Sequence, residues 1–174
     1  MSNDEFLEKI AKSEFLPKTS QITTYRFEEK FLECVEAGYE AVIVTLINST
    51  GSATYENAVT AKNKLEAQGK LADTKFFILD SHCYSLGYGY PVVEAAKRAQ
   101  AGMEPERIVA FMEDWFNCCE IYIVGFELRH MKKSGRISAA AAFLGEMLQL
   151  KPVISLIDGK SVVVKKCRGE KLAV

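Results

Sequence analysis

Residues 41–67 constrain the fold of this chain most, because they predict a strand, a polar loop and a helix in direct succession. Residues 41–47 form a short, continuous apolar run rich in β-branched side chains, which is typical of a buried parallel strand. Ala58, Ala61 and Leu65 then recur at the spacing of one helix face. A strand followed directly by a helix is the repeating unit of α/β proteins.

The loop between this strand and this helix is rich in hydrogen-bonding side chains, and we call residues 48–54 the hydroxyl loop. The residues with a side-chain hydroxyl or amide are Asn48, Ser49, Thr50, Ser52 and Thr54. In open α/β sheets ligands bind at the carboxyl ends of the strands, and a helix N-terminus favours anionic groups. We therefore expect an anion-binding site in the hydroxyl loop.

The composition argues against several classes of protein. With 174 residues, the chain can hold one domain, or one domain and part of a second. A net charge of −1 makes nucleic acid a poor partner. No apolar run approaches the ~18 residues of a membrane span, so no stable membrane insertion is expected, and the N-terminus lacks a signal-peptide pattern. Five cysteines without a CxxC pair and only two histidines predict no metal site. Buried thiols in a reducing cytoplasm explain the cysteines best.

The remaining pattern up to residue 124 predicts helices that alternate with short apolar strands. The fold class that this order indicates is α/β, with a mostly parallel sheet and helices on both of its faces. The predicted helices cover a segment from Thr23 or Thr24 to Gly38, residues 91–101 and a segment from Pro105 to Trp115, and the predicted strands cover residues 75–79 and 120–124.

From residue 126 the pattern changes to a short helix near Leu128, an alanine-rich helix at 139–150 and a hairpin. The Asp158-Gly159 pair between two β-rich segments is a strong signal for an antiparallel hairpin. We therefore predict a first α/β domain at 1–124 and the beginning of a smaller α/β domain at 125–174. No strand precedes the first helix and about fifty residues are few for a second domain. We expect a chain truncated at both ends, without the N-terminal strands of its first domain.

A second polar loop, DSHCYSLGYG at 80–89, follows the predicted strand 75–79. Its GxG pattern is weak evidence for a nucleotide site, because the third glycine of the dinucleotide fingerprint is missing. Asp80, Ser81 and His82 are adjacent in sequence, but a catalytic triad requires convergence in space. An alternative function is therefore a small α/β hydrolase or isomerase with a Ser/His site. A further alternative is a truncated fragment that binds no ligand and dimerises through exposed sheet edges.

Five sequence blocks together support a more specific interpretation. They are KTSQ at 18–21, INSTGSATYENA at 47–58, DSHCYSLGYG at 80–89, LRHMKKSGRIS at 128–138 and LKPVISLIDGK at 150–160. In order and spacing this set resembles the DegV family of bacterial fatty-acid-binding proteins. The resemblance implies a parallel α/β domain followed by a smaller α/β domain, with a long-chain fatty acid bound between them.

The resemblance also implies roles for particular residues. The family's Ser-Gly-Thr is Ser52-Ala53-Thr54 here, and an alanine is strained if this position needs a positive φ angle. The residues expected to bind the fatty-acid carboxylate are Thr19, Ser20, Ser52, Ala53 and Thr54. Those expected near the carboxylate, on the surface that faces a partner, are Arg136 and Arg168. The resemblance assigns no catalytic residue to this chain.

The function that the resemblance implies is that of a lipid carrier in the cytoplasm, and not that of an enzyme. A member of the family holds the fatty acid and presents it to a separate fatty acid kinase. The kinase makes the acyl phosphate, which feeds phospholipid synthesis. The ligand is the fatty acid, and no cofactor is implied. Burial of the acyl chain would supply most of the affinity, at roughly 0.8 kcal/mol per CH₂ group.

Overall fold

The computed structural model describes residues 1–15, 17–124 and 150–168. The chain divides into two compact units. The α/β unit contains Gln21–Tyr122 and the short segment Ser155–Lys160, and the terminal unit contains Met1–Ser20, Ile123–Ile154 and Ser161–Val174. The helix predicted near Leu128 and residues 139–149 of the next predicted helix lie outside the described residues, and Leu150, the predicted end of that helix, begins a strand.

The α/β unit is built on two parallel strands, β1 (Ala41–Leu46) and β2 (Lys75–Asp80). Ala41 lies opposite Lys75 and Leu46 lies opposite Asp80, so both strands end at the same level. The structure thus confirms the two strands that the short apolar runs predicted.

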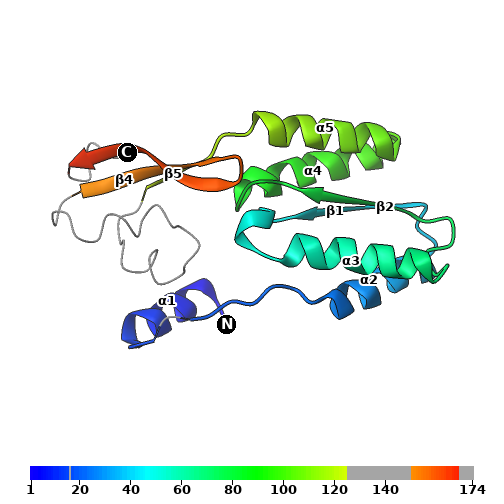
Figure 1. Cartoon of the computed structure of the whole chain (residues 1–174), viewed down its shortest axis with the longest axis horizontal. Helices are drawn as coiled ribbons and strands as arrows, with labels where there is room; N and C mark the ends of the chain where they lie inside the picture. The colour runs from blue at the N-terminus through cyan, green and yellow to red at the C-terminus, as the bar shows by residue number, and fades with distance from the viewer. Residues whose placement is uncertain (16, 125–149, 169–174) are drawn as a thin grey trace. The chain divides into compact units, whose positions relative to one another are not determined.

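Four helices cover the two faces of this sheet (Figure 1). The helices α2 (Thr24–Glu36) and α3 (Thr54–Ala67) pack on one face, and α4 (Leu86–Gln100) and α5 (Pro105–Cys118) pack on the other. Because successive side chains of a strand point to opposite faces, each core takes alternate strand residues. The α2–α3 core takes Val42, Val44, Phe76 and Ile78 from the strands, and the α4–α5 core takes Ile43, Phe77 and Leu79. The predicted α/β class is confirmed.

Helix α4 begins at Leu86, five residues before the predicted start at residue 91. The sequence prediction was wrong here because proline is usually found in the first turn of a helix. Pro91 instead lies inside α4, where it cannot donate a hydrogen bond to the carbonyl of Gly87. The indole Nε1 of Trp115 donates to that carbonyl at 3.1 Å and replaces the missing bond.

The terminal unit contains the helix α1 (Asn3–Lys12), which begins with a capping box between Ser2 and Glu5. The strands β3 (Tyr122–Val124), β4 (Leu150–Ile157) and β5 (Lys160–Arg168) form a sheet in the order β3-β4-β5. The predicted hairpin is confirmed, since β4 and β5 are joined by Asp158 and Gly159, both with positive φ.

The bounds of these units differ from those of the predicted domains 1–124 and 125–174. The segment Met1–Ser20 belongs to the terminal unit, and the hairpin turn Ser155–Lys160 belongs to the α/β unit. The domain division therefore stays a prediction. Within the described ranges, no helix is both long and apolar enough to cross a membrane.

Candidate ligand-binding site at the carboxyl edge of the sheet

The hydroxyl loop and the loop after β2 lie side by side at the carboxyl edge of the sheet. The amide of Ser81 donates to the carbonyl of Leu46 at 3.1 Å, and the amide of Asn48 donates to the carbonyl of Cys83 at 3.1 Å. These crossed hydrogen bonds follow from the parallel register, because both loops leave the sheet at the same level. The predicted position of the site at this edge thus corresponds to two loops that are hydrogen-bonded to each other.

The hydroxyl loop begins with a short 3₁₀ helix, η1 (Ser49–Gly51), which Asn48 caps. The side-chain oxygen of Asn48 accepts a hydrogen bond from the amide of Thr50 at 3.3 Å. After η1 the chain becomes extended at Ser52, with φ −156° and ψ 134°, and then enters α3. Ser52 therefore stands at the junction between the 3₁₀ helix and the N-terminus of α3.

The structure brings three of the predicted site residues together at this junction. The Ser52 Oγ lies 2.8 Å from the Thr54 Oγ1 and accepts a hydrogen bond from the Thr54 amide at 3.3 Å. Ala53 has φ −71°, so this loop needs no positive φ angle and alanine is not strained there. The N-cap residue Ala53 has no side-chain oxygen and makes no cap of its own. The result is a pair of hydroxyls beside the positive end of a helix dipole, an arrangement that suits a carboxylate.

The side chain of Asp80 organises the neighbouring loop. Its carboxylate accepts hydrogen bonds from the amide of Ser49 at 3.1 Å and from the amide of His82 at 3.0 Å. The imidazole Nδ1 of His82 lies 3.3 Å from the same carboxylate. Asp80 therefore ties the hydroxyl loop to the loop after β2.

The geometry of Ser81 gives no support to the alternative Ser/His enzyme. The Ser81 hydroxyl is buried, donates to the carbonyl of Cys83 at 3.3 Å and accepts from the amide of Cys83 at 3.2 Å. It thus stabilises its own turn, while the His82 side chain is 58% exposed and contacts Asp80. A nucleophilic serine requires a base that is hydrogen-bonded to its hydroxyl.

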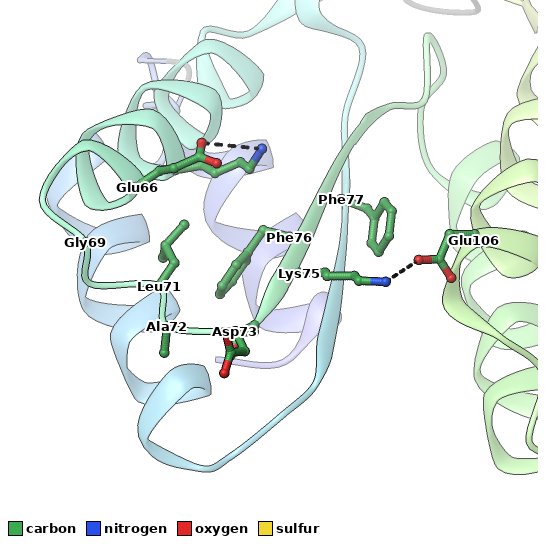
Figure 2. Close-up of a pocket in the computed structure, with 11 residues that line it drawn as sticks. Glu66, Gly69, Leu71, Ala72, Asp73, Lys75, Phe76, Phe77 and Glu106 are labelled. Carbon is green, nitrogen blue, oxygen red and sulfur yellow. Dashed lines mark hydrogen bonds and ion pairs between the residues drawn. The ribbon is translucent and has the colours of Figure 1, made fainter.

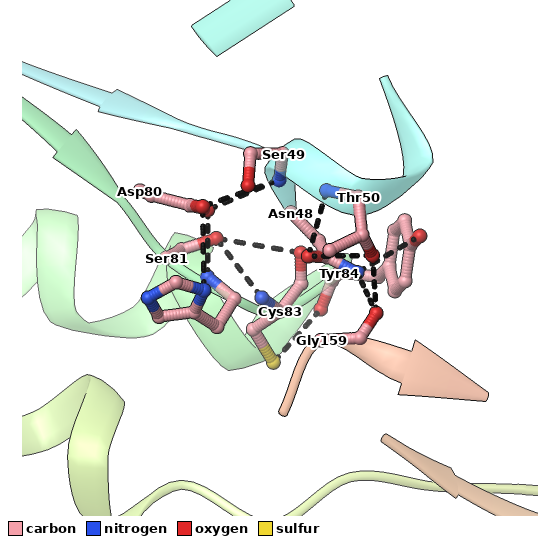
Figure 3. A network of polar contacts seen from close by, with 9 residues as sticks. Asn48, Ser49, Thr50, Asp80, Ser81, Cys83, Tyr84 and Gly159 are labelled. Atoms are coloured by element: carbon pink, nitrogen blue, oxygen red, sulfur yellow. Dashed lines mark hydrogen bonds and ion pairs between the residues drawn. The ribbon is translucent and has the colours of Figure 1, made fainter. Parts of the chain in front are cut away.

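The sequence analysis missed a hydrogen-bond network that joins the hydroxyl loop to Tyr84 and to the hairpin turn, and we call it the Asn48 network (Figure 3). Its members are Asn48, Thr50, Tyr84 and Gly159. Asn48 is fully buried, and its Nδ2 donates to the carbonyl of Gly159 at 2.8 Å and to the Tyr84 hydroxyl at 3.3 Å. The Thr50 hydroxyl also donates to the Gly159 carbonyl. Nothing in the sequence connects a polar residue in one loop with a hairpin turn 111 positions later.

Comparison with known proteins gives a family match over the whole chain. The family model described as "Uncharacterised protein, DegV family" matches residues 1–174. The chain belongs to the DegV family. A DegV domain-containing protein of Halalkalibacterium halodurans is 31% identical over 173 residues, which make up 99% of this chain and 59% of that protein. This DegV chain spans about three fifths of the length of the curated relatives that it matches.

Solved DegV structures share the fold. A fatty acid binding DegV family protein from Streptococcus agalactiae matches with a TM-score of 0.84 and 29% identity, over 98% of this chain and 59% of that one. A DegV family protein from Thermus thermophilus, described for its fatty acid binding, matches with a TM-score of 0.82 and 28% identity. That match covers 99% of this chain and 59% of the other.

The other site residues expected for a DegV protein lie elsewhere in the chain. Thr19 and Ser20 are exposed and belong to the terminal unit. Arg168 is exposed at the end of β5. Arg136 lies outside the described residues. The structure thus groups only Ser52, Ala53 and Thr54, and the roles of all the predicted residues stay predictions.

A buried thiol, that of Cys83, lies near the hydroxyl loop of this DegV chain. Cys83 is 3% exposed, and its Sγ lies 3.9 Å from the Sγ of Cys119. Burial raises the pKa of the Cys83 thiol, which therefore stays protonated and unreactive near neutral pH. Cys118, by contrast, is exposed, so the prediction of buried thiols does not hold for every cysteine. Within the described part of the chain, no group of three His, Cys, Asp or Glu residues could hold a metal ion.

A pocket of about 490 Å³ lies at the opposite, amino edge of the sheet (Figure 2). It forms between the end of α3 and the start of β2, and Lys62, Glu66, Lys75 and Glu106 are among its lining residues. Two ion pairs join these charges, Lys75–Glu106 at 2.7 Å and Lys62–Glu66 at 3.9 Å. Since both ammonium groups already have carboxylate partners, this pocket is a poorer carboxylate site than the hydroxyl loop.

Proposed function

We propose that this DegV protein binds a long-chain fatty acid and holds its carboxylate in the hydroxyl loop. The observation that carries the proposal is the pairing of the Ser52 and Thr54 hydroxyls at the N-terminus of α3. Hydroxyls at the positive end of a helix can bind a carboxylate without a buried cation. The fatty acid binding described for the DegV proteins of S. agalactiae and T. thermophilus supports the same ligand.

The proposed carboxylate site includes Thr19 and Ser20 with Ser52, Ala53 and Thr54. Arg136 and Arg168 are proposed to lie near the carboxylate, on the surface that a fatty acid kinase contacts. The chain acts as a cytoplasmic carrier in this proposal, and the kinase forms the acyl phosphate that feeds phospholipid synthesis. Protein loaded with fatty acid should therefore form acyl phosphate with ATP and magnesium only when a fatty acid kinase is added. Product formation without the kinase would contradict the carrier role.

The variant Ser52→Ala tests the ligand site. A hydrogen bond to a charged group contributes about 1.5–3 kcal/mol, so losing the Ser52 hydroxyl should weaken oleate binding about tenfold or more. Isothermal titration calorimetry measures the dissociation constant. The matched control is Ser49→Ala, which removes a hydroxyl from the same loop and should bind like the unchanged protein.

Native mass spectrometry of the protein purified from bacteria gives an independent test. We expect a co-purified long-chain acid on the unchanged protein and less of it on the Ser52→Ala variant. Equal oleate affinity of Ser52→Ala and the unchanged protein would refute the role of Ser52. A protein that neither co-purifies with a fatty acid nor binds oleate would refute the proposed function.

A further inference from the structure

The side chain of Asn48, the first residue of the hydroxyl loop, has hydrogen-bond partners for both its amide nitrogen and its oxygen. It is fully buried, donates to Gly159 and Tyr84, and accepts from the amide of Thr50. A buried side-chain amide whose nitrogen and oxygen are both hydrogen-bonded adopts one orientation. If the Asn48 amide were flipped, its Nδ2 donor would face the Thr50 N–H donor, and its oxygen would face the Gly159 carbonyl oxygen. Asn48 therefore fixes the start of the loop in one conformation.

The hairpin turn fits against Asn48 only because it ends in glycine. Gly159 has φ +72°, and a Cβ atom built there would lie 2.9 Å from the Thr50 Cγ2 and 3.0 Å from the Asn48 Oδ1. Its carbonyl accepts from both the Asn48 Nδ2 and the Thr50 hydroxyl. One backbone carbonyl of the turn thus holds two side chains of the hydroxyl loop.

The Asn48 network continues towards Ser52. The amide of Gly51 donates to the Asn48 carbonyl at 3.1 Å, and Gly51 packs so closely on Tyr84 that a Cβ would meet its hydroxyl at 2.1 Å. Tyr84 is itself hydrogen-bonded to Asn48. Gly51, the residue directly before Ser52, is therefore fixed by a hydrogen bond to Asn48 and by packing against Tyr84.

We propose that Asn48 and Thr50 are positioning residues, which use the carbonyl of Gly159 to fix the loop that presents the Ser52 and Thr54 hydroxyls. This inference rests on the proposed function and extends the ligand site to groups that touch no ligand. The hairpin turn is then a part of the carboxylate site, and a change in the turn alters ligand affinity through the hydroxyl loop.

The variant pair Thr50→Val and Thr50→Ser tests this inference. Valine keeps the shape of threonine but removes the hydroxyl donor, whereas serine keeps the donor. We expect Thr50→Val to bind oleate at least about fivefold more weakly by calorimetry, and Thr50→Ser to stay within about twofold of the unchanged protein. Asn48→Asp should behave like Thr50→Val, because its carboxylate cannot donate to Gly159. All affinities are measured at a temperature at which each variant is folded by circular dichroism.

Hydrogen exchange provides a second readout that needs no ligand. The backbone amides of Thr50 and Gly51 should exchange faster in Thr50→Val, while the amides of β1 and β2 keep their rates. Equal oleate affinity in Thr50→Val and Thr50→Ser, or unchanged exchange at Thr50 and Gly51, would overturn the positioning role.

The two proposals fail in different ways. If the unchanged protein does not bind oleate, the proposed function fails, and the exchange rates still decide whether Asn48 and Thr50 fix the loop. If Ser52→Ala weakens binding and Thr50→Val does not, the positioning role fails and the proposed function stands.

Discussion

At the scale of single residues, two separate constraints favour glycine at position 159, its φ angle and the space available for a side chain. Its positive φ angle favours glycine in the hairpin turn, and its close contact with Asn48 and Thr50 leaves no room for a Cβ atom. Gly38 at the end of α2 has a similar φ of +76°, but nothing lies within 4 Å of a Cβ placed there. The two glycines therefore differ only in the second constraint.

This difference gives a prediction for two alanine substitutions. Gly38→Ala should lower the free energy of unfolding by about 1–2 kcal/mol, the cost of a left-handed conformation for an L-residue. Gly159→Ala should cost more than this, because the added methyl group also displaces Thr50 and Asn48. Urea denaturation measures both values. Equal losses in the two variants would show that the turn tolerates a Cβ at this contact.

The common position of Ser52, Ala53 and Thr54 follows from local sequence, because they lie between a recognisable strand and a recognisable helix. Their role in carboxylate binding stays a prediction. Asn48 was counted among the polar residues of the same loop, but its partner Gly159 lies 111 positions away. Such a pairing depends on tertiary structure, and one sequence contains no signal for it.

At the scale of elements, α4 and α5 are joined by a hydrogen bond that compensates for a proline. Pro91 leaves the carbonyl of Gly87 without its helical partner, and the indole of Trp115 in α5 supplies the donor. The ring of Trp115 also packs against Tyr90, with 5.2 Å between the ring centroids. The early start of α4 thus involves a residue of another helix, and this explains why a start at Pro91, the usual place of a proline, was too late.

A double-mutant cycle tests this compensation. Trp115→Phe removes the indole donor and should lower the free energy of unfolding by about 1–3 kcal/mol, because the Gly87 carbonyl then keeps only the weak Cys119 thiol as a donor. In the background of Pro91→Ala, a backbone N–H is restored to the helix, and the same substitution should cost less. Chemical denaturation of the four proteins gives the coupling energy. Additive effects of the two substitutions would contradict the compensation.

At the scale of the whole molecule, the dependence of stability on pH should reflect the ion pair between Lys75 and Glu106, which connects β2 with α5. The hydrogen bond from Lys75 lowers the pKa of Glu106 below its ordinary 4.5, and the hydrogen bond to Glu106 raises the pKa of Lys75 above 10.5. The Glu106 contribution is therefore present above pH 4.5 and is lost as the pH falls through the lowered pKa. The Lys75 contribution is present below pH 10.5 and is lost as the pH rises through the raised value.

We expect Glu106→Gln to flatten the acid limb of the stability curve, and Lys75→Gln to flatten it less, because a backbone hydrogen bond also lowers the pKa of Glu106 and remains in that variant. The double variant should follow Glu106→Gln, since Lys75 acts on this limb through Glu106. Urea midpoints measured from neutral pH into the range below 4.5 follow this limb. The effect is small because both side chains are more than half exposed. Acid limbs that stay parallel in all variants would rule out this pair as their cause.

The organisation of the whole molecule was predicted in part. The alternation of apolar strands and amphipathic helices was sufficient for the α/β class, because each element reports its own periodicity. The predicted domain division at residue 124 gives each domain one continuous stretch of sequence, and it stays a prediction. The α/β unit of the structure also includes the separate segment Ser155–Lys160. A single sequence does not show that this segment belongs to the α/β unit, because its turn residues are those of any hairpin.

The distance along the chain between Asn48 and Gly159 has a consequence for chain-closure entropy. Their hydrogen bond closes a loop of 111 residues, whereas the bond from Asn48 to Tyr84 closes a loop of 36. The longer loop costs about 1 kcal/mol more conformational entropy, which is comparable to the net contribution of one hydrogen bond. Of these two contacts, the one between the turn and the hydroxyl loop therefore has the larger entropic cost of loop closure. Under the proposed function, a fatty acid whose binding requires this contact would stabilise it, and the hairpin turn would in the same way strengthen fatty-acid binding.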